Sequence, residues 1–463
     1  MIEIPANGIK ASADSNAITY NHIKVIGDLE LDRPEYNSIK IINSIIEGNI
    51  SASNASFNGD VYFTNTSFRK NATFFNSEFK GNVDFSESQF YGDANFSQSR
   101  FLKGATFDYN TFDKKADFSA SEFEKFGSFY DSTFGGNAVF ILTLFNGAYA
   151  NFESAKFVES AEFANSQFNT FFSCINAKYL KDANFRGVEF ASGSNFNNVT
   201  FLGPARFDKS QFIQDSRFRN IFFNSTVDFT SARFDGPSFF NNAHFRRNAI
   251  LDSVQFMGPS DLSGAQFDKD LCMNSTKIST MVLDNATFNS GSHLFLAKAD
   301  INRFMVKWDM IKHLLSYDSS AYLSLVKNYK DLGLSEADDC YYQYRQLSQD
   351  LKSWSWSKVY DVLADITCGY GVRPDRPIIC SLFLVILCSS ILFWRNGLRI
   401  PSNMDKKTSF YDSLYYCLAI FFTIPLPDLK PSGKYRYIPV FLRALSWTLF
   451  ALLIGTIGKV MIK

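Results

Sequence analysis

The sequence predicts a multi-domain β + α membrane protein, in which a long β-helix is followed by a helical hairpin and by two transmembrane helices with a re-entrant helix between them. Three observations lead to this fold class. Phenylalanine recurs at alternating steps of five and six residues between Phe63 and Phe145. The spacing of apolar residues becomes helical after about Asp300, and two long apolar runs lie within residues 377–457. A self-similar period of eleven residues is typical of a solenoid.

The phenylalanine ladder defines the core of the predicted β-helix. Two residues before most rungs there is a small residue, usually Ala or Ser, as at Ala72 and Ser77. Residues two apart in a strand point to the same face. Each short strand should therefore direct one small and one large side chain inward, with a turn after it. The first rungs are Phe63, Phe68, Phe74, Phe79, Phe85, Phe90, Phe96, Phe101, Phe107, Phe112, Phe118, Phe123, Phe129, Phe134, Phe140 and Phe145.

The ladder shifts by one residue near Ala150 and then continues, with Cys174 and Tyr179 on two of its rungs. This pattern resembles the pentapeptide-repeat family in its Phe-rich form. The resemblance implies a right-handed quadrilateral β-helix with four sides and about 22 residues per coil. We expect this β-helix over residues 57–298. Residues 1–56 carry aliphatic alternation instead and should form an N-terminal cap and the first coils.

The composition excludes several function classes. The 463 residues contain 46 basic and 46 acidic side chains, and this balance argues against a nucleic-acid partner. The seven cysteines form no CxxC pair, and the four histidines share no motif with one another or with the cysteines. No glycine-rich phosphate loop is present. We therefore expect no enzyme, no catalytic residue, no metal site and no cofactor.

A helical hairpin is expected over residues 299–370. Phe304, Trp308, Ile311 and Leu315 have the spacing of one helical face. Gly333 is expected to end a helix.

Ser335 is expected to open the next helix of the hairpin, with Asp338 in the capping-box position. The run from Gly333 to Arg345 and the stretch CGYGVRP, Cys368–Pro374, resemble the hairpin and junction that join repeats to membrane segments in some prokaryotic pentapeptide-repeat proteins.

The membrane domain is expected over residues 371–463. Its spans are residues 377–394, which carry no charge, and residues 438–457, where Arg443 lies near the start. The first span is about 27 Å long at ~1.5 Å per residue, which is enough for a thin bilayer core. The alternative, a buried hairpin of a soluble protein, is disfavoured because the first span has no charged face.

Residues 409–431 lie between the spans and should form a pore helix and loop. The apolar part, residues 410–422, is too short to cross a bilayer and suits a re-entrant helix. The arrangement resembles the two-span pore module of tetrameric cation channels, with Thr423 on the filter threonine and Asp428 on the aspartate after the filter. The predicted filter residues are Thr423, Ile424, Pro425, Leu426, Pro427 and Asp428.

This loop departs from the family where the potassium filter has glycine. Pro425 and Pro427 occupy the two glycine positions, and proline cannot adopt the left-handed dihedrals that the filter needs. We therefore expect no potassium selectivity. The C-terminal end of the pore helix favours cations, whereas basic residues of the vestibule favour anions, so both selectivities remain open. The basic residues are Lys430, Lys434, Arg436 and Arg443.

These features predict an oligomeric ion channel with a cytoplasmic β-solenoid. Its partners would be membrane lipid, the permeant ions and further copies of the chain, four in total if the pore module follows the family. We expect it in the cell membrane, with the repeat domain and the C-terminus in the cytoplasm, because no basic start with an apolar run precedes the repeats. The alternative is a membrane-anchored pentapeptide-repeat scaffold whose channel-like anchor does not conduct.

Overall fold

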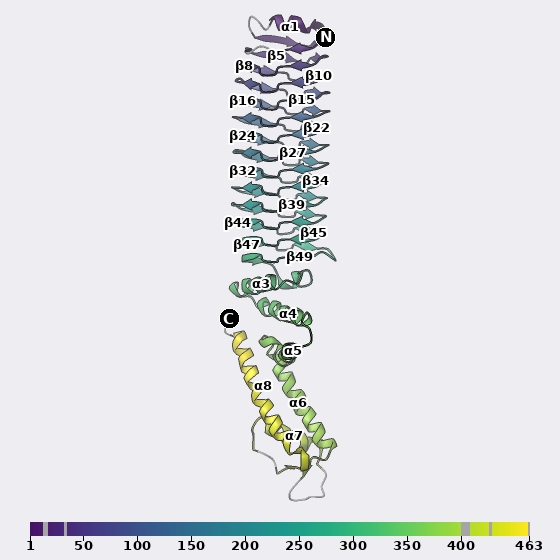
Figure 1. Cartoon of the computed structure of the whole chain (residues 1–463), viewed down its shortest axis with the longest axis vertical. Helices are drawn as coiled ribbons and strands as arrows, with labels where there is room; N and C mark the ends of the chain where they lie inside the picture. The colour runs from purple at the N-terminus through teal and green to yellow at the C-terminus, as the bar shows by residue number, and fades with distance from the viewer. Residues whose placement is uncertain (13–16, 32–34, 400–407, 426–427, 462–463) are drawn as a thin grey trace. The chain divides into compact units, whose positions relative to one another are not determined.

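The computed structural model describes residues 1–12, 17–31, 35–399, 408–425 and 428–461. The chain divides into two compact units, Met1–Ser324 and Leu325–Lys463. The first unit is the β-solenoid, and the second contains the helices α4 to α8 (Figure 1). The two units are described separately below.

One coil of the solenoid has four short strands. In the coil that begins at Ser67 these are β10 (Ser67–Phe68), β11 (Ala72–Thr73), β12 (Glu78–Phe79) and β13 (Val83–Asp84). Each strand pairs in parallel with the strand 22 residues further on, as Phe68 pairs with Phe90 and Ala72 with Ala94. The predicted quadrilateral β-helix with four strands per coil is therefore present.

The four sides form three sheets of 14, 13 and 23 strands. The largest sheet contains two sides, because near the end of the solenoid β44 (Gln255–Asp261), β47 (Lys277–Val282) and β50 (Asp300–Met305) continue across one corner. For example, β44 pairs with both β40 (Arg233–Phe234) and β41 (Ser238–Phe239), which belong to neighbouring sides. The 13-stranded sheet has one strand from each coil, which gives about 13 coils.

The ladder residues form columns of stacked rings along the solenoid. Phe96 stacks on Phe74 and on Phe118, one coil away on either side, with ring centroids 4.9 and 5.0 Å apart. Rings of neighbouring columns meet edge to face, as Phe107 does with Phe118 at 5.1 Å. Both geometries are favourable for aromatic pairs, so the inward direction of the rungs is confirmed.

The serines before the rungs have a second role besides being small. The Ser88 hydroxyl donates a hydrogen bond to the Phe63 carbonyl oxygen (2.6 Å), and the Ser99 hydroxyl donates to that of Phe74 (2.6 Å). Both acceptors lie in the preceding coil. These bonds satisfy polar groups in a fully buried place, where an unpaired hydroxyl would cost stability.

The turns between strands use left-handed backbone conformations. Residues such as Asn43, Asn65 and Asn76 have φ between 50° and 53°. Asn tolerates this region better than most residues other than Gly. The Asn65 side-chain amide also donates to Asn43 Oδ1 of the preceding coil (2.9 Å), so the turns themselves are linked along the solenoid.

The two ends of the solenoid differ from its middle. At the N-terminal end, β1 (Ile2–Pro5) pairs with β3 (Ile23–Ile26), and the helix α1 (Ala6–Ser12) lies at the end of the coils with Ile9 buried (Figure 1). The aliphatic residues of the first coils are buried, as their alternation predicts: Ile23, Val25, Leu29, Leu31, Ile39, Ile41 and Ile46.

At the other end, the helical interpretation of Phe304 is wrong. Phe304 lies in β50 opposite Met281 of β47, and only the four residues of α2 (Trp308–Ile311) that follow are helical. A strand that extends an existing sheet edge satisfies its backbone at once, and this outweighs a helical spacing of a few residues. After α2 comes α3 (Ser319–Asp331), which Gly333 follows with φ +68°, as its predicted role at a helix end requires.

In the second unit, α4 (Glu336–Asp350) and α5 (Trp356–Cys368) form the hairpin, and the short 3₁₀-helix η1 (Gly369–Gly371) follows. The predicted capping box at Ser335 is wrong. Ser335 has a helical backbone (φ −67°, ψ −22°), and its side chain makes no cap bond to the backbone. An N-cap residue normally has extended dihedrals, which place its hydroxyl near the free N–H groups. Ser355 does so at the start of α5, where its side chain accepts from the N–H of Lys358.

Candidate functional site

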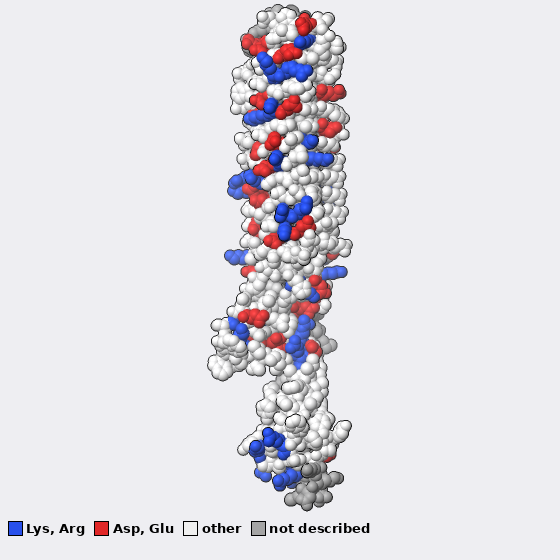
Figure 2. Space-filling view, turned by 90° about the vertical axis from the view of Figure 1, so that its right-hand side faces the viewer, with Lys and Arg blue, Asp and Glu red and all other residues white. Residues whose placement is uncertain are grey.

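Two long apolar helices dominate the second unit. They are α6 (Asp375–Trp394) and α8 (Tyr437–Met461), and both are long and apolar enough to cross a membrane. Only 28% of the apolar window of α6 and 22% of that of α8 are buried within the chain. Figure 2 shows a band without charged residues on the visible face of these helices. A hairpin buried in a soluble core would not expose so much apolar surface.

A shorter helix, α7 (Phe410–Phe421), lies between the two long ones. Ser409 and Asp412 form a capping box at its start: the Asp412 N–H donates to Ser409 Oγ (3.2 Å), and the Ser409 N–H donates to the Asp412 carboxylate (2.8 Å). The 12 residues of α7 extend about 18 Å, which is too short to cross a bilayer core of roughly 30 Å.

The packing of α7 explains how so short a helix is held. It contacts both α6 and α8, near the ends of these helices that lie away from α5 (Figure 1). One apolar cluster joins the three helices, and its buried members are Val385, Cys388, Leu392, Leu398, Tyr416, Cys417, Ile420, Phe421, Leu442 and Leu449. The position of α7 is thus fixed by side chains from both long helices.

The chain turns sharply at the C-terminal end of α7. The Ile424 N–H donates to the Ala419 carbonyl (2.8 Å), and the Phe422 N–H donates to that of Leu418 (2.9 Å). Between them Thr423 has φ +56°, the left-handed conformation that glycine usually supplies at a helix end. A β-branched residue is strained in this conformation. Such strain is common at functional sites, and the sequence alone did not reveal it here.

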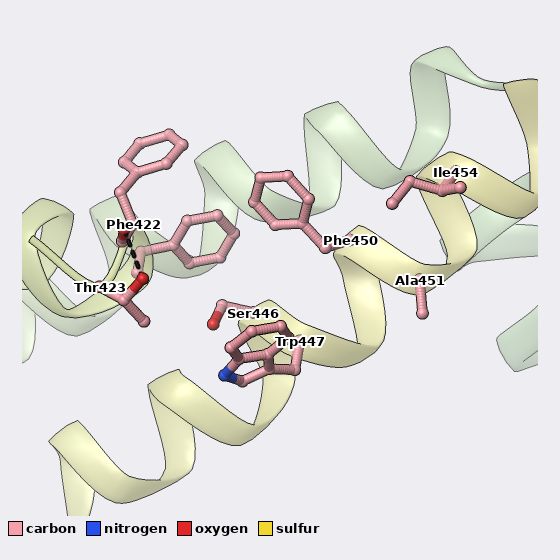
Figure 3. Close-up of a pocket in the computed structure, with 8 residues that line it drawn as sticks. Phe422, Thr423, Ser446, Trp447, Phe450, Ala451 and Ile454 are labelled. Carbon is pink, nitrogen blue, oxygen red and sulfur yellow. Dashed lines mark hydrogen bonds between the residues drawn. The ribbon is translucent and has the colours of Figure 1, made fainter.

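A cavity of about 420 Å³ opens between this turn and α8 (Figure 3). From the end of α7 it is lined by Phe421, Phe422 and Thr423, and from α8 by Ser446, Trp447, Phe450, Ala451 and Ile454. Trp447 and Ile454 are 66% and 67% exposed in the single chain. The lining is therefore an apolar face with few polar groups, and it is open to whatever lies next to α8.

The predicted filter residues follow the turn. Ile424 and Pro425 are exposed, and so is Asp428. Leu426 and Pro427 lie outside the described residues. Thr423 and the residues after it thus follow the buried end of α7, while no described contact places Asp428 beside the cavity.

The basic residues lie beside this loop. The two-residue strands β51 (Leu398–Arg399) and β52 (Lys430–Pro431) pair antiparallel, so that Arg399 stands opposite Lys430. Lys434 and Arg436 are exposed in the 3₁₀-helix η2 (Gly433–Arg436), and Arg443 is exposed two turns into α8. Figure 2 shows Lys and Arg gathered at this end of the unit. Arg399, which is also exposed, belongs to this basic surface.

At the opposite end of the long helices, the hairpin contacts both of them. The Arg373 guanidinium, just before α6, donates to Asp339 of α4 (2.7 Å). Arg376, in the first turn of α6, donates to the Tyr342 hydroxyl (3.0 Å), which itself donates to Asp365 of α5 (2.8 Å). The Lys459 ammonium of α8 lies 4.9 Å from the ring centre of Tyr341. Aromatic and charged residues of α4 and α5 therefore connect the start of α6 to the end of α8.

Asp361 of α5 forms a second group of ion pairs within the hairpin. It accepts from the Arg345 guanidinium of α4 (2.8 Å) and from the Lys352 ammonium, and its side chain is 13% exposed. The hydrogen bond from Lys352 holds the pKa of Asp361 below its ordinary value, with further help from Arg345 and against the effect of burial. These bonds fix the direction in which α5 packs on α4.

The junction motif CGYGVRP forms a turn in which three successive residues have left-handed backbone conformations. Gly369, Tyr370 and Gly371 have φ of 51°, 54° and 80°. The Tyr370 ring is buried, its hydroxyl bonds to Gln349, and the Arg345 guanidinium lies 4.9 Å from its ring centre. Burial raises the pKa of Tyr370 to about 12. Three successive left-handed residues separate α5 from α6, so the two helices are not one continuous helix.

The described residues include no group of three His, Cys, Asp or Glu side chains that could hold a metal ion. All seven cysteines are reduced thiols, and five of them, Cys174, Cys340, Cys368, Cys388 and Cys417, are buried. The features of the second unit that bear on its function are its two apolar helices, the turn at Thr423 and the basic residues at its end.

The fold and this site define a membrane protein of the channel type, in which a short helix and its loop lie between two apolar helices and a β-solenoid precedes them. Comparison with protein families agrees. Residues 74–122 and 179–221 match the family described as pentapeptide repeats (9 copies), and residues 379–463 match the family described as ion channel. The chain thus carries pentapeptide repeats, and its C-terminal part matches an ion-channel family. No curated protein and no solved structure matches it.

Proposed function

We propose that the protein is an oligomeric ion channel, with ions passing beside the turn at Thr423 and along α8. The observation that carries this proposal is α7. It is too short to cross a bilayer, it is packed between two helices that are long enough, and its C-terminal end carries a strained turn and exposed loop residues. A helix whose C-terminal end is directed at a passage would place its negative dipole end there.

The passage requires several copies of the chain, because two long helices from one copy enclose no pore. The exposed face of α8 with Trp447, Phe450 and Ile454 supports this requirement, since a neighbouring copy would cover it. We propose four copies, the number in the family that the pore module resembles. In such an assembly the cavity of Figure 3 would lie between the passage and the neighbouring copy.

We propose that the passage does not select potassium. Pro425 stands where the filter of that family has glycine, and Thr423 already uses the left-handed conformation two residues before that position. The filter would be Thr423, Ile424, Pro425, Leu426, Pro427 and Asp428. The basic residues Lys430, Lys434, Arg436 and Arg443 would form the vestibule and raise the local concentration of anions, in opposition to the dipole of α7.

We propose further that the chain has four parts: a cap over residues 1–56, repeats over 57–298, a hairpin over 299–370 and the pore domain over 371–463. The two spans would lie in the cell membrane. The repeats and the C-terminus would lie in the cytoplasm. The contacts of Arg373, Arg376 and Lys459 with the hairpin support one common side for the start of α6 and the end of α8.

Conduction can be tested by cysteine modification in a reconstituted protein whose seven native cysteines are replaced by alanine. Ala451→Cys places a thiol on the cavity lining, and Leu382→Cys places one on the outward face of α6, where Leu382 is 57% exposed. A charged methanethiosulfonate reagent should change the current of the Ala451→Cys channel and leave that of Leu382→Cys unchanged. The proposal fails if neither protein conducts under any ionic gradient.

A second candidate function is a scaffold, in which the pore domain only anchors the solenoid to the membrane. Pro425 and the strained Thr423 favour it, because neither allows the regular row of carbonyls that a potassium filter has. Particles of the intact protein that show symmetric copies with a closed axis, no ion flux, and a partner protein bound to the solenoid would support the scaffold over the channel.

A further inference from the structure

One face of the hairpin is largely exposed in the described part of the chain. It consists of Trp354, in the turn before α5, and of Trp356, Tyr360, Leu363 and Ile366 of α5. The two tryptophans are 83% and 80% exposed, Tyr360 is 69% exposed, and Leu363 and Ile366 are both 51% exposed. We call these five residues the aromatic face. A surface that exposes so many large apolar side chains together normally has a binding partner.

The aromatic face is one side of an amphipathic helix. Trp356, Tyr360 and Leu363 are spaced by four and three residues, which places them above one another on α5. Asp361 and Asp365 lie on the opposite side, where they bond to Arg345, Lys352 and Tyr342 within the hairpin. These bonds determine which side of α5 faces outward, so the exposure of the aromatic face does not come from a free rotation of the helix.

The aromatic face continues into the apolar surface of the membrane helices. A groove of about 430 Å³ runs from Ile366 and Thr367 of α5 to Ile379 and Phe383 of α6 and Leu449 of α8. The Cys380 thiol of α6 lies 3.3 Å from the Ile366 carbonyl oxygen. Ile379 and Phe383 are themselves 57% and 64% exposed. The same medium that surrounds α6 therefore reaches the end of the aromatic face.

The backbone between α5 and α6 turns α5 away from the direction of α6. The turn is made by η1, with three left-handed residues, and only Val372, Arg373 and Pro374 lie between it and α6. Figure 1 shows α5 beside the end of α6 and not in line with it. An amphipathic helix placed at the end of a membrane span, with its apolar side outward, has the geometry of a helix that lies in the membrane interface.

The chemistry of the aromatic face also fits a lipid surface better than a protein. Trp and Tyr are enriched at the level of the lipid headgroups, where an apolar ring and a polar N–H or O–H are both accommodated. The Lys358 ammonium lies 5.6 Å from the ring centre of Trp354, so a cation accompanies the rings at the edge of the face. Lysine beside aromatic residues is common in interfacial helices, since it reaches the phosphate groups.

We propose that α5 is an interfacial helix whose aromatic face binds the phospholipid bilayer that α6 and α8 cross, at the boundary between headgroups and acyl chains. The inference depends on the insertion of α6 and α8 into a membrane, and it does not depend on conduction. The hairpin would then have two roles. It connects the start of α6 to the end of α8, and it holds this connection against the lipid surface.

The test measures the depth of Trp356 in the membrane. In a full-length variant, Trp308, Trp354, Trp394 and Trp447 are replaced by Phe, and the protein is reconstituted in vesicles of phosphatidylcholine and phosphatidylglycerol. Lipids that carry bromine near the headgroup should quench the fluorescence of Trp356, and aqueous iodide should quench it weakly. The matched control keeps Trp308 as the single tryptophan. It is buried in the first unit, 3% exposed, and neither quencher should reach it.

Two results would overturn the proposal. Strong quenching of Trp356 by iodide with none by brominated lipid would place the face in water. Quenching by neither would place it against another protein surface, for example a second copy of the chain. If the single-tryptophan variants do not fold, a photoactivatable phosphatidylcholine can be crosslinked to the unmodified protein. Crosslinks within residues 354–366 are expected, and their absence where α6 is crosslinked would contradict the proposal.

Discussion

The ring of Phe172 fills the space that Cys174 leaves in the solenoid core. Cys174 occupies a rung between Phe152 and Phe196, and the Phe172 ring lies between the same two rings, 5.7 and 5.2 Å from their centroids. Phe172 itself stands in the row of small residues, opposite Ala150 and Ser194. In this coil the large and the small residue have exchanged places, and both are fully buried.

This exchange predicts a non-additive pair of mutations. Cys174→Phe alone should destabilise the protein by ~1–3 kcal/mol, because two rings would compete for one space. Phe172→Ala alone should cost ~3–5 kcal/mol through the cavity that it leaves. The double mutant should be more stable than either single mutant, since it restores the regular ladder. Chemical unfolding of the detergent-solubilised protein measures the three changes, and strict additivity would contradict the exchange.

A charge in the ladder should not be tolerated. The Phe118 ring stacks between those of Phe96 and Phe140, each 5.0 Å away, and is fully buried. Phe118→Asp should therefore reduce the stability of the solenoid by several kcal/mol or prevent its folding, because a carboxylate would be buried without a partner. Phe126→Asp is the matched control, since the Phe126 ring is only partly buried and stacks with Tyr149 on the surface. A melting curve of Phe118→Asp that matches that of the control would refute the role of the rung.

The left-handed residue at the end of α7 predicts a stabilising substitution. Thr423→Gly should raise the thermal midpoint of the pore domain, because it relieves a backbone strain of ~1–3 kcal/mol. Thr448→Gly, in the regular interior of α8, should instead lower stability by a few tenths of a kcal/mol. If the strain at Thr423 contributes to the shape of the passage, the stabilised variant should also show an altered conductance. A lower midpoint for Thr423→Gly would show that this turn is not left-handed.

The ion pairs of Asp361 predict a pH dependence of the hairpin. The pKa of Asp361 is lowered in the folded protein, so its contribution to stability is complete above its ordinary pKa of about 3.9 and is lost as the pH falls through the lowered value. Asp361→Asn should remove this contribution. The difference in stability between wild type and variant should thus be constant near neutral pH and shrink below about pH 4. A difference that grows on acidification would contradict the assigned ion pairs.

The sequence predicted the solenoid because every coil repeats the same spacing of small and large inward-facing residues. A ring at Phe96 and one at Phe118 predict the same inward face independently, so single exceptions do not disturb the register. The exchange of Phe172 and Cys174 was not predictable in this way, since Phe172 appears outside the ladder in the sequence. Phe304 was misassigned for a related reason: only the edge of the preceding coil, which lies far away in the sequence, makes that segment a strand.

In the membrane domain the sequence predicted the helix near residues 410–422, because its apolar run is too short to cross a bilayer. The capping box at its start was not part of that prediction. The left-handed Thr423 was not predicted, since a threonine gives no local signal for that conformation. The aromatic face was also missed. Trp356, Tyr360 and Leu363 form a helical stripe that is equally typical of a core. The ion pairs of Asp361 and the hydrogen bond from Tyr342 to Asp365 show that the stripe points outward.

The pairing of each coil with only its two neighbours has a consequence for how such chains diversify. A duplication or loss of 22 residues adds or removes one complete layer, about 4.8 Å thick, and the layers on either side meet the same hydrogen-bond partners as before. The length of the solenoid can therefore change in steps of one coil, while the pore module that follows it stays the same.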